Sequence, residues 1–214
     1  MPFILSEQNT LANQFLLELR DANIQQDRLR FRKNMERLGE IMAYEVSRKL
    51  KYDETQVKTQ LGVSTLNVLK EQPVLLTILR AGLPFFQGFQ NFFDQADCGF
   101  IGAYRLEDEH DVTIKLEYVA TTSLEGRCVI VIDPMLATGR SVLDSIHAVL
   151  KNGTPAFCHI VSLVAAPEGI TFLKTNLKIA HALWTCALDE KLNQKFYIVP
   201  GLGDAGDLSF GEKI

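Results

Sequence analysis

The sequence has few of the residues that build metal-binding or disulfide-linked proteins. Only 4 cysteines occur among 214 residues, at positions 98, 128, 158 and 186, and they form no Cys-x-x-Cys pair. The 4 histidines are also scattered, with no His-x-x-x-His pair. Because zinc sites need closely spaced ligands, we expect no zinc site and interpret the cysteines as reduced, half-buried thiols.

Long apolar runs and an excess of positive charge are missing as well. The N-terminal MPFILSEQNT lacks the basic flank and the apolar length of a signal peptide. The uncharged stretch from Asn152 to Pro167 is too short and too polar to span a bilayer. Lys and Arg number 22 against 26 Asp and Glu, a net charge of −4, which argues against a protein that coats nucleic acid. We therefore expect a soluble, cytoplasmic protein without a membrane or nucleic-acid partner, although a local basic pocket for a phosphate is compatible with this charge.

The first fifty residues have a helical pattern, and an apolar stripe runs along the region 28–50. The stripe has the spacing of one helix face and is typical of core or of a subunit contact. Its members are Phe31, Met35, Leu38, Met42 and Val46. We assign it no chemistry.

After Pro73, short aliphatic runs alternate with helical stretches. This alternation predicts an α/β fold with a mainly parallel central sheet flanked by helices. No linker or internal repeat is present, so we expect a single domain over residues 1–214. The expected strands are 73–79, 98–106, 112–121, 128–133, 157–166 and 178–188, and the expected helices are 85–93, 141–153 and 167–176.

The loop after strand 128–133 has the chemistry of a phosphate site. Asp133 ends the strand, Gly139 permits a tight turn, and the N–H groups of the next helix can face an anion. Thr138 and Ser141 add hydroxyl donors, and Ser141 is a candidate N-cap. The pattern is neither a Walker A loop nor a dinucleotide fingerprint. A strand–turn–helix with a satisfied cap is the alternative explanation.

Two further blocks follow expected strands. In LRAGL, Arg80 precedes small residues that let backbone N–H groups approach a polyanion, whereas a solvated arginine in a common turn is the alternative. YIVPGLGDAGD, from Tyr197 to Asp207, is rich in glycine and could be a simple turn. Chemically, such a loop could present fixed backbone donors to the O4 of uracil and reject the amine of cytosine.

These motifs together resemble uracil phosphoribosyltransferases of the type I phosphoribosyltransferase family. The resemblance spans the chain: N-terminal helices, ILRAGL, Tyr104-Arg105, DPMLATG, LVAAPEG and PGLGDAGD occur in the family's order and spacing. It implies a type I fold with N-terminal helices and a C-terminal base-binding segment. Pro84 and Arg140 depart from the family, where glycine is usual, and the stretch LEDEHDV after Arg105 departs from the family's flap, so only Arg105 is carried over from it. Since arginine adopts a positive φ only at a cost, we expect Arg140 in an ordinary helical conformation.

The resemblance also implies roles for particular residues. The residues nearest the chemistry would be Arg80, Asp133 and Asp204. Phosphoribosyl pyrophosphate (PRPP) would be bound by Arg80, Arg105, Asp133, Pro134, Met135, Leu136, Ala137, Thr138, Gly139, Arg140, Ser141 and Asp204. Uracil would be framed by Met135, Ala137, Tyr197, Ile198, Gly203, Asp204 and Ala205. LVAAPEG would serve packing and loop geometry.

The activity implied by the resemblance is transfer of ribose 5-phosphate from PRPP to N1 of uracil, giving UMP and diphosphate through an oxocarbenium-like transition state. Mg²⁺ would be held through PRPP and water near Asp204, without direct protein ligands. GTP as an activator and a homo-oligomer are further expectations. The alternatives are a pyrimidine-sensing RNA-binding regulator on the same fold, a phosphoribosyltransferase for another base, and a binding protein without turnover.

Overall fold

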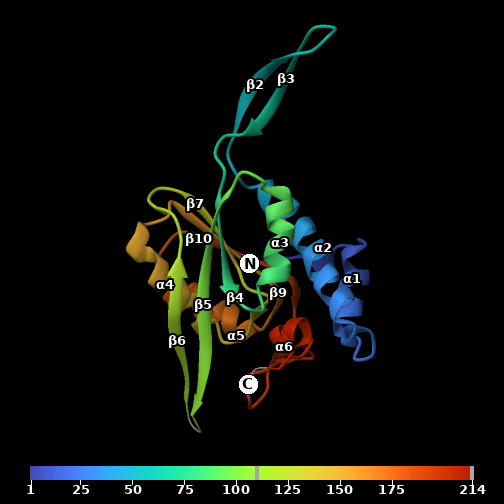
Figure 1. Ribbon diagram of the computed structural model, residues 1–214, viewed down its shortest axis with the longest axis vertical. Coiled ribbons are helices and arrows are strands. Elements are labelled where there is room, and N and C mark those ends of the chain that lie inside the picture. The colour runs from blue at the N-terminus through green and yellow to red at the C-terminus, as the bar shows by residue number, and fades with distance from the viewer. Residues whose placement is uncertain (109–110, 213–214) are drawn as a thin grey trace.

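The central sheet follows from runs of aliphatic residues whose side chains alternate between two covered faces. The computed structural model describes residues 1–108 and 111–212, with side chains outside residues 103–117 (Figure 1). The sheet has the strand order β1-β10-β9-β7-β4-β5-β6, and β8 pairs with β9. Only β5 and β6 pair antiparallel within this sheet; the other pairings are parallel, as the sequence predicts.

Six strands of the sheet lie close to the expected ranges: β4 (Val74–Leu79), β5 (Asp97–Asp108), β6 (Asp111–Ala120), β7 (Cys128–Ile132), β9 (Phe157–Ala165) and β10 (His181–Leu188). Two short strands that the sequence did not predict complete it: β1 (Phe3–Ile4) and β8 (Met135–Leu136). The helices are α1 (Ala12–Arg20), α2 (Arg28–Ser47), α3 (Leu83–Phe92), α4 (Arg140–Val149), α5 (Pro167–Asn176) and α6 (Ala205–Phe210), with short 3-10 turns at Leu5–Glu7, Ile24–Gln26 and Leu150–Asn152.

Two hydrophobic cores cover the two faces of the sheet. On one face, Leu75 and Ile130 pack in the cluster that holds the apolar residues of α1, α2 and α3. On the other face, Leu76 and Val131 pack with those of α4 and α5. Neighbouring residues of one strand therefore enter opposite cores, as the period of two in a strand requires. The predicted stripe on α2 lies in the first core and is at most 1% exposed, so its assignment to packing is confirmed.

Two parts of the fold differ from the sequence interpretation. The prediction of helix throughout the first fifty residues is wrong at Phe3–Ile4, which adds a parallel edge strand to β10. Apolar residues that bury against a sheet edge can form a strand whatever the local helical pattern. The second difference is a hairpin of β2 (Tyr52–Lys58) and β3 (Val63–Leu69), which projects from the body at the end opposite α6 (Figure 1).

Candidate active site

The carboxyl ends of the parallel strands bring the predicted loops together. Arg80 directly follows β4, and Asp133 directly follows β7, its hydrogen-bonded neighbour in the sheet. Thr77 on β4 donates a hydrogen bond of 3.2 Å to the carbonyl of Ile132. Ligands of open α/β sheets bind at this edge, so the arrangement places the anion-binding candidates on the functional side of the sheet.

Backbone bonds from β9 and close packing of α5 hold the phosphate loop, Asp133–Ser141, in place. The carbonyl of Pro134 accepts from Leu163 N and Val164 N, both at 3.1 Å, and the carbonyl of Leu136 accepts from Ala166 N at 2.9 Å. A Cβ added at Gly169 would lie 2.3 Å from the carbonyl oxygen of Ala137. The LVAAPEG block thus supports the loop through packing and backbone bonds, which confirms its structural assignment.

The turn into α4 forms as a glycine-dependent helix start. Gly139 has φ of +80° and is the N-cap residue, and Arg140 is the first residue of the helix, so the expected helical conformation of Arg140 is confirmed. The prediction that Ser141 is the N-cap is wrong: Ser141 is the second helical residue, because the left-handed turn at Gly139 begins the helix earlier. The first intrahelical bond joins Leu143 N to the Gly139 carbonyl. Arg140 N, which precedes it, donates to Thr138 Oγ1 at 3.3 Å, and the first turn of a helix is where N–H groups and the helix dipole can face an anion.

The arginine loop continues directly into α3. Pro84 is buried and occupies the first turn of this helix, where the missing N–H leaves no backbone bond unmade. The departure from glycine at this position is therefore accommodated by an ordinary helix start. Arg80 Nη2 donates to Asp207 Oδ1 at 2.9 Å and to the Gly211 carbonyl at 2.8 Å. These bonds connect the arginine loop to α6 and so to the C-terminal segment.

The C-terminal segment forms a short hairpin, a glycine turn and a helix. The hairpin pairs β11 (Lys191–Leu192) with β12 (Ile198–Val199). Asp204 is the N-cap of α6, and its Oδ1 accepts from Gly206 N at 2.8 Å and from Asp207 N at 3.0 Å. This cap fixes the start of α6 beside the arginine loop, because it satisfies two N–H groups of the first turn.

The predicted base-binding residues fall into buried and exposed sets. Ile198, Ala205 and Ala137 are buried in one hydrophobic cluster, and Met135 packs against it half-buried. Tyr197, Gly203 and Asp204 are exposed. Buried apolar side chains together with an exposed glycine–acid turn suit a flat ring with polar edges.

Not every predicted residue can be placed. Arg105 lies on β5, where its backbone pairs with Ile114 of β6, but its side chain lies outside the described residues. Thr138 Oγ1 accepts from Arg140 N at 3.3 Å, so this hydroxyl takes part in the turn itself.

Within residues 1–108 and 111–212, no cysteine or histidine belongs to the loops described above. All four cysteines are free, and Cys158 and Cys186 are fully buried rather than half-buried as expected, because β9 and β10 lie inside the sheet. Burial raises the pKa of Cys128 to about 11. It lowers the pKa of His159 to about 4, and the neutral ring accepts a bond of 3.0 Å from Trp184 Nε1. Among residues 1–108 and 111–212 no group of three or more His, Cys, Asp or Glu side chains is arranged to hold a metal ion.

The sequence did not predict a cluster of contacts at Gly201, within the segment Tyr197–Asp207 that resembles a uracil loop and is called the base segment below. Arg20 at the end of α1 and Asp189 after β10 form an ion pair of 2.7 Å, and both bond the backbone of Gly201. No local motif marks these residues, since they are separated by 169 positions in the chain.

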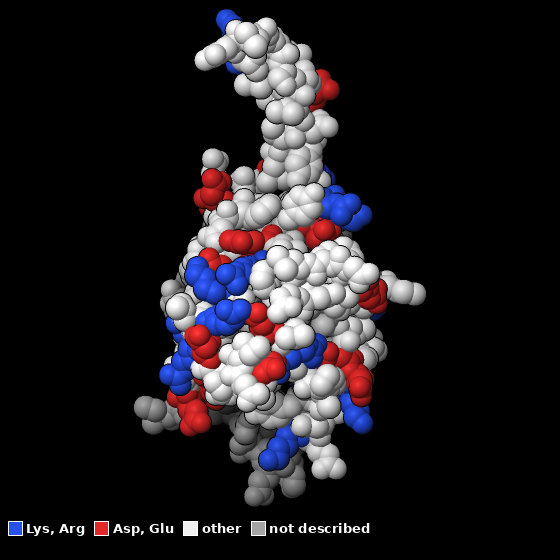
Figure 2. Space-filling model, turned by 90° about the vertical axis from the view of Figure 1, so that its right-hand side faces the viewer, with Lys and Arg blue, Asp and Glu red and all other residues white. Residues whose placement is uncertain are grey.

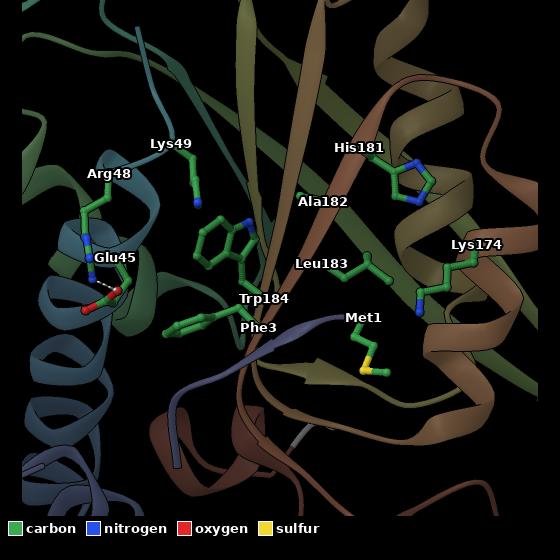
Figure 3. A pocket seen from close by; sticks show the side chains of 10 residues that line it. All are labelled: Met1, Phe3, Glu45, Arg48, Lys49, Lys174, His181, Ala182, Leu183 and Trp184. Atoms are coloured by element: carbon green, nitrogen blue, oxygen red, sulfur yellow. Dashed lines mark hydrogen bonds and ion pairs between the residues drawn. The ribbon is translucent and has the colours of Figure 1, made fainter. Parts of the chain in front are cut away.

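A cavity of about 580 Å³ lies at the amino end of β10, away from the strand ends that carry the loops. In Figure 3 the Lys49 side chain points toward the ring of Trp184 on one side of the cavity, and His181 and Lys174 lie on the opposite side. Arg48 pairs with Glu45 at 3.0 Å, whereas Lys49 and Lys174 have no ion pair within the described part of the chain. The lining residues are Met1, Phe3, Glu45, Arg48, Lys49, Lys174, His181, Ala182, Leu183 and Trp184.

A mainly parallel sheet with an arginine loop, an acid–turn–helix phosphate loop and a glycine-rich C-terminal segment defines the class of type I phosphoribosyltransferases. Within this class, the family model of uracil phosphoribosyltransferase matches residues 6–212, and the chain belongs to that family.

Individual relatives agree with this assignment. The chain is 43% identical to a uracil phosphoribosyltransferase of Porphyromonas gingivalis over 211 residues, which cover 98% of each chain. It is 37% identical to one of Methanothermobacter thermautotrophicus over 183 residues, which cover 85% of this chain and 83% of the relative. The solved structure of a protein from Aquifex aeolicus superimposes with a TM-score of 0.87 at 31% identity and covers 100% of both chains. Among the described helices, none is both long and apolar enough to cross a membrane.

Proposed function

We propose that this chain, as a single domain over residues 1–214, transfers ribose 5-phosphate from PRPP to N1 of uracil, giving UMP and diphosphate. The observation that carries the proposal is the bond between Arg80 and Asp207, because it links the anion-binding arginine loop to the segment that resembles a uracil loop. The relatives are named uracil phosphoribosyltransferases, and neither name is that of an RNA-binding regulator.

The anionic ends of PRPP would be bound by different loops. The first turn of α4, with Thr138 and Ser141, would hold the 5′-phosphate in the helix-dipole field. Asp133, at the end of β7, would orient the ribose hydroxyls. Arg80 and Arg105 would stabilise the negative charge that grows on the departing diphosphate.

Uracil would lie over the apolar floor of Ala137, Ile198 and Ala205, with Gly203 and Asp204 at its polar edge. The transition state develops positive charge at the anomeric carbon, so catalysis rests on positioning and charge stabilisation more than on a nucleophile. Asp204 is a poor candidate for the base that accepts the N1 proton, since its Oδ1 already accepts two backbone bonds.

The acids of the C-terminal segment fit a Mg²⁺ ion carried by PRPP. Asp204 Oδ1 caps α6 and Asp207 pairs with Arg80, so the described residues form no complete set of protein ligands. Mg²⁺ prefers phosphate oxygens and water together with one or two carboxylates, and Asp204 could contact its waters. When bound, the ion would neutralise charge on the diphosphate.

The direct test is formation of UMP from uracil, PRPP and Mg²⁺, with cytosine and hypoxanthine as competitors. We expect UMP from uracil and little effect of either competitor; for cytosine the reason is that fixed backbone donors reject its amine. Absence of product while PRPP still binds would contradict the proposal, and RNA binding would then be measured.

We further propose that the cavity of Figure 3 is where a purine nucleotide such as GTP would activate the enzyme. Lys49 and Lys174 offer charge to phosphates, and Trp184 and Phe3 offer aromatic surface. GTP activation should therefore be lost in Lys49→Gln/Lys174→Gln while activity without GTP is retained. Lys33→Gln, on the exposed face of α2, is the matched control. Equal activation of all three proteins would contradict this site.

A homo-oligomer stays a prediction, and the hairpin of β2 and β3 supports it. An isolated two-stranded hairpin is marginally stable in water. Its register places Val57, Leu66 and Val68 on one face, with 47%, 57% and 43% exposure, and Figure 2 shows mostly uncharged atoms along it. We propose that a second copy covers this face. Light scattering should show a smaller assembly for Val57→Asp/Leu66→Asp, and an unchanged mass would contradict the proposal.

A cytoplasmic location also stays a prediction, which cell fractionation would test.

A further inference from the structure

The ion pair between Arg20 and Asp189 joins three parts of the chain that are distant in the sequence: the end of α1, the residue after β10, and Gly201 of the base segment. Arg20 Nη2 donates to Asp189 Oδ1 at 2.7 Å, and Arg20 Nη1 donates to Asp189 Oδ2 at 2.9 Å. This two-bond geometry matches the planar guanidinium to the carboxylate and fixes their relative orientation. The Asp189 side chain is only 5% exposed and that of Arg20 is 24% exposed, so the pair is shielded from water.

The same pair bonds both backbone groups of Gly201. Arg20 Nη1 donates to the Gly201 carbonyl at 2.9 Å, and Gly201 N donates to Asp189 Oδ2 at 2.8 Å. Gly201 has φ of +61°, and a Cβ there would lie 2.2 Å from the Ile198 carbonyl oxygen. The Gly201 peptide is therefore hydrogen-bonded to the ion pair and packed closely against the Ile198 carbonyl.

Gly201 lies between the two parts of the proposed uracil site. Ile198 precedes it on β12, and Gly203, Asp204 and Ala205 follow it. A shift of the Gly201 peptide would change the distance between the apolar floor and the exposed turn. Neither Arg20 nor Asp189 belongs to the arginine loop or to the phosphate loop.

We propose that Arg20 and Asp189 are positioning residues that set the affinity for the base and the discrimination against cytosine. The inference rests on the proposed function, since it concerns the segment that would bind uracil. The pair acts through the Gly201 peptide and touches neither substrate. Loss of the pair leaves backbone donors mobile, so both the affinity for uracil and the rejection of an amine at its O4 position decrease.

The test is steady-state kinetics of Asp189→Asn and Arg20→Lys in the full chain. Asparagine places an NH₂ group where Arg20 or Gly201 needs an acceptor, and lysine lacks the two-bond geometry of arginine. For Asp189→Asn we expect the KM for uracil to rise about 10- to 100-fold, with a KM for PRPP within about twofold of wild type. Arg20→Lys should have an intermediate KM for uracil, and cytosine should inhibit both variants more strongly than wild type.

Glu18→Gln is the matched control. Glu18 also lies on α1 and forms a 2.7 Å ion pair with Arg30 of α2, and its other partners, Gln14 and Asn34, lie on the same two helices. The Glu18→Gln variant should have a lower midpoint of thermal unfolding and an unchanged KM for uracil. If Glu18→Gln raises this KM as Asp189→Asn does, the effect comes from the stability of α1 and the proposal fails. It also fails if neither Asp189→Asn nor Arg20→Lys changes the KM for uracil, or if both KM values rise together. Absence of UMP with wild-type protein would instead contradict the proposed function.

Discussion

Gly169→Ala should impair PRPP use although residue 169 lies outside the substrate-binding loops. The added Cβ would lie 2.3 Å from the Ala137 carbonyl oxygen and 3.0 Å from that of Leu136. Non-bonded heavy atoms are stable at about 3.5 Å, so the phosphate loop must move by about 1 Å. A displacement of this size at a positioning element can reduce a rate about 100-fold.

The stability of the variant should change much less than its activity. Alanine is favoured over glycine in a helix by up to about 1 kcal/mol, which offsets part of the steric cost in α5. The assay is therefore kcat and the KM for PRPP in UMP formation, together with the midpoint of thermal unfolding. We expect kcat/KM for PRPP to decrease about 10- to 100-fold while the protein stays folded.

A second glycine provides the control for this experiment. A Cβ added at Gly62, in the turn between β2 and β3, would meet no atom within 4 Å. Gly62→Ala should therefore retain wild-type kinetics. If Gly169→Ala also has the kcat and the KM for PRPP of wild type, the phosphate loop does not depend on its contact with α5, and the reasoning is refuted.

Three further predictions follow from the site and the core. Asp133→Asn and Arg80→Ala should each remove about 2–4 kcal/mol of transition-state stabilisation in UMP formation without unfolding the protein. A kcat/KM near that of wild type for either variant would contradict the catalytic role proposed for that residue. Burial lowers the pKa of His159 from 6.5 to about 4, so its contribution to the free energy of unfolding is full above pH 6.5 and is lost as the pH falls towards 4. Urea unfolding of His159→Asn should show a weaker pH dependence in this window, and an unchanged dependence would contradict the assignment. The Arg30 and Asn34 side chains lower the pKa of Glu18 from 4.5 to about 2, so stability should decline between pH 4.5 and 2, and Glu18→Gln should remove that decline.

Local patterns predicted the six longer strands of the sheet, and the resemblance to a known family identified its loops. The apolar run Cys128–Ile132 predicted a buried strand, and the acid, glycine turn and helix that follow it fitted either a phosphate loop or a capped turn until the family resemblance favoured the phosphate loop. The edge at which these loops meet also follows from a parallel α/β order. The start of α4 could not be placed to the residue, because Gly139 and Ser141 are both acceptable N-caps and only the backbone turn distinguishes them.

Local sequence patterns could not predict the hairpin of β2 and β3 or the short strand β1, for another reason. Residues 52–69 bury little apolar surface, so neither helical nor strand periodicity related to a core is present. Phe3 and Ile4 become a strand only because the edge of β10 is open to pair with them.

Tertiary structure alone decided how the base segment is held. The bonds from Arg20 to Asp189 and Gly201 join residues that are 169 and 181 positions apart, and Arg80 reaches Asp207 across 127 positions. Sequence motifs describe which residues can bind phosphate or a base, because that chemistry depends on neighbouring residues along one loop. The distances between loops depend on how helices and sheet pack, and long-range packing leaves no signal in the local order of residues.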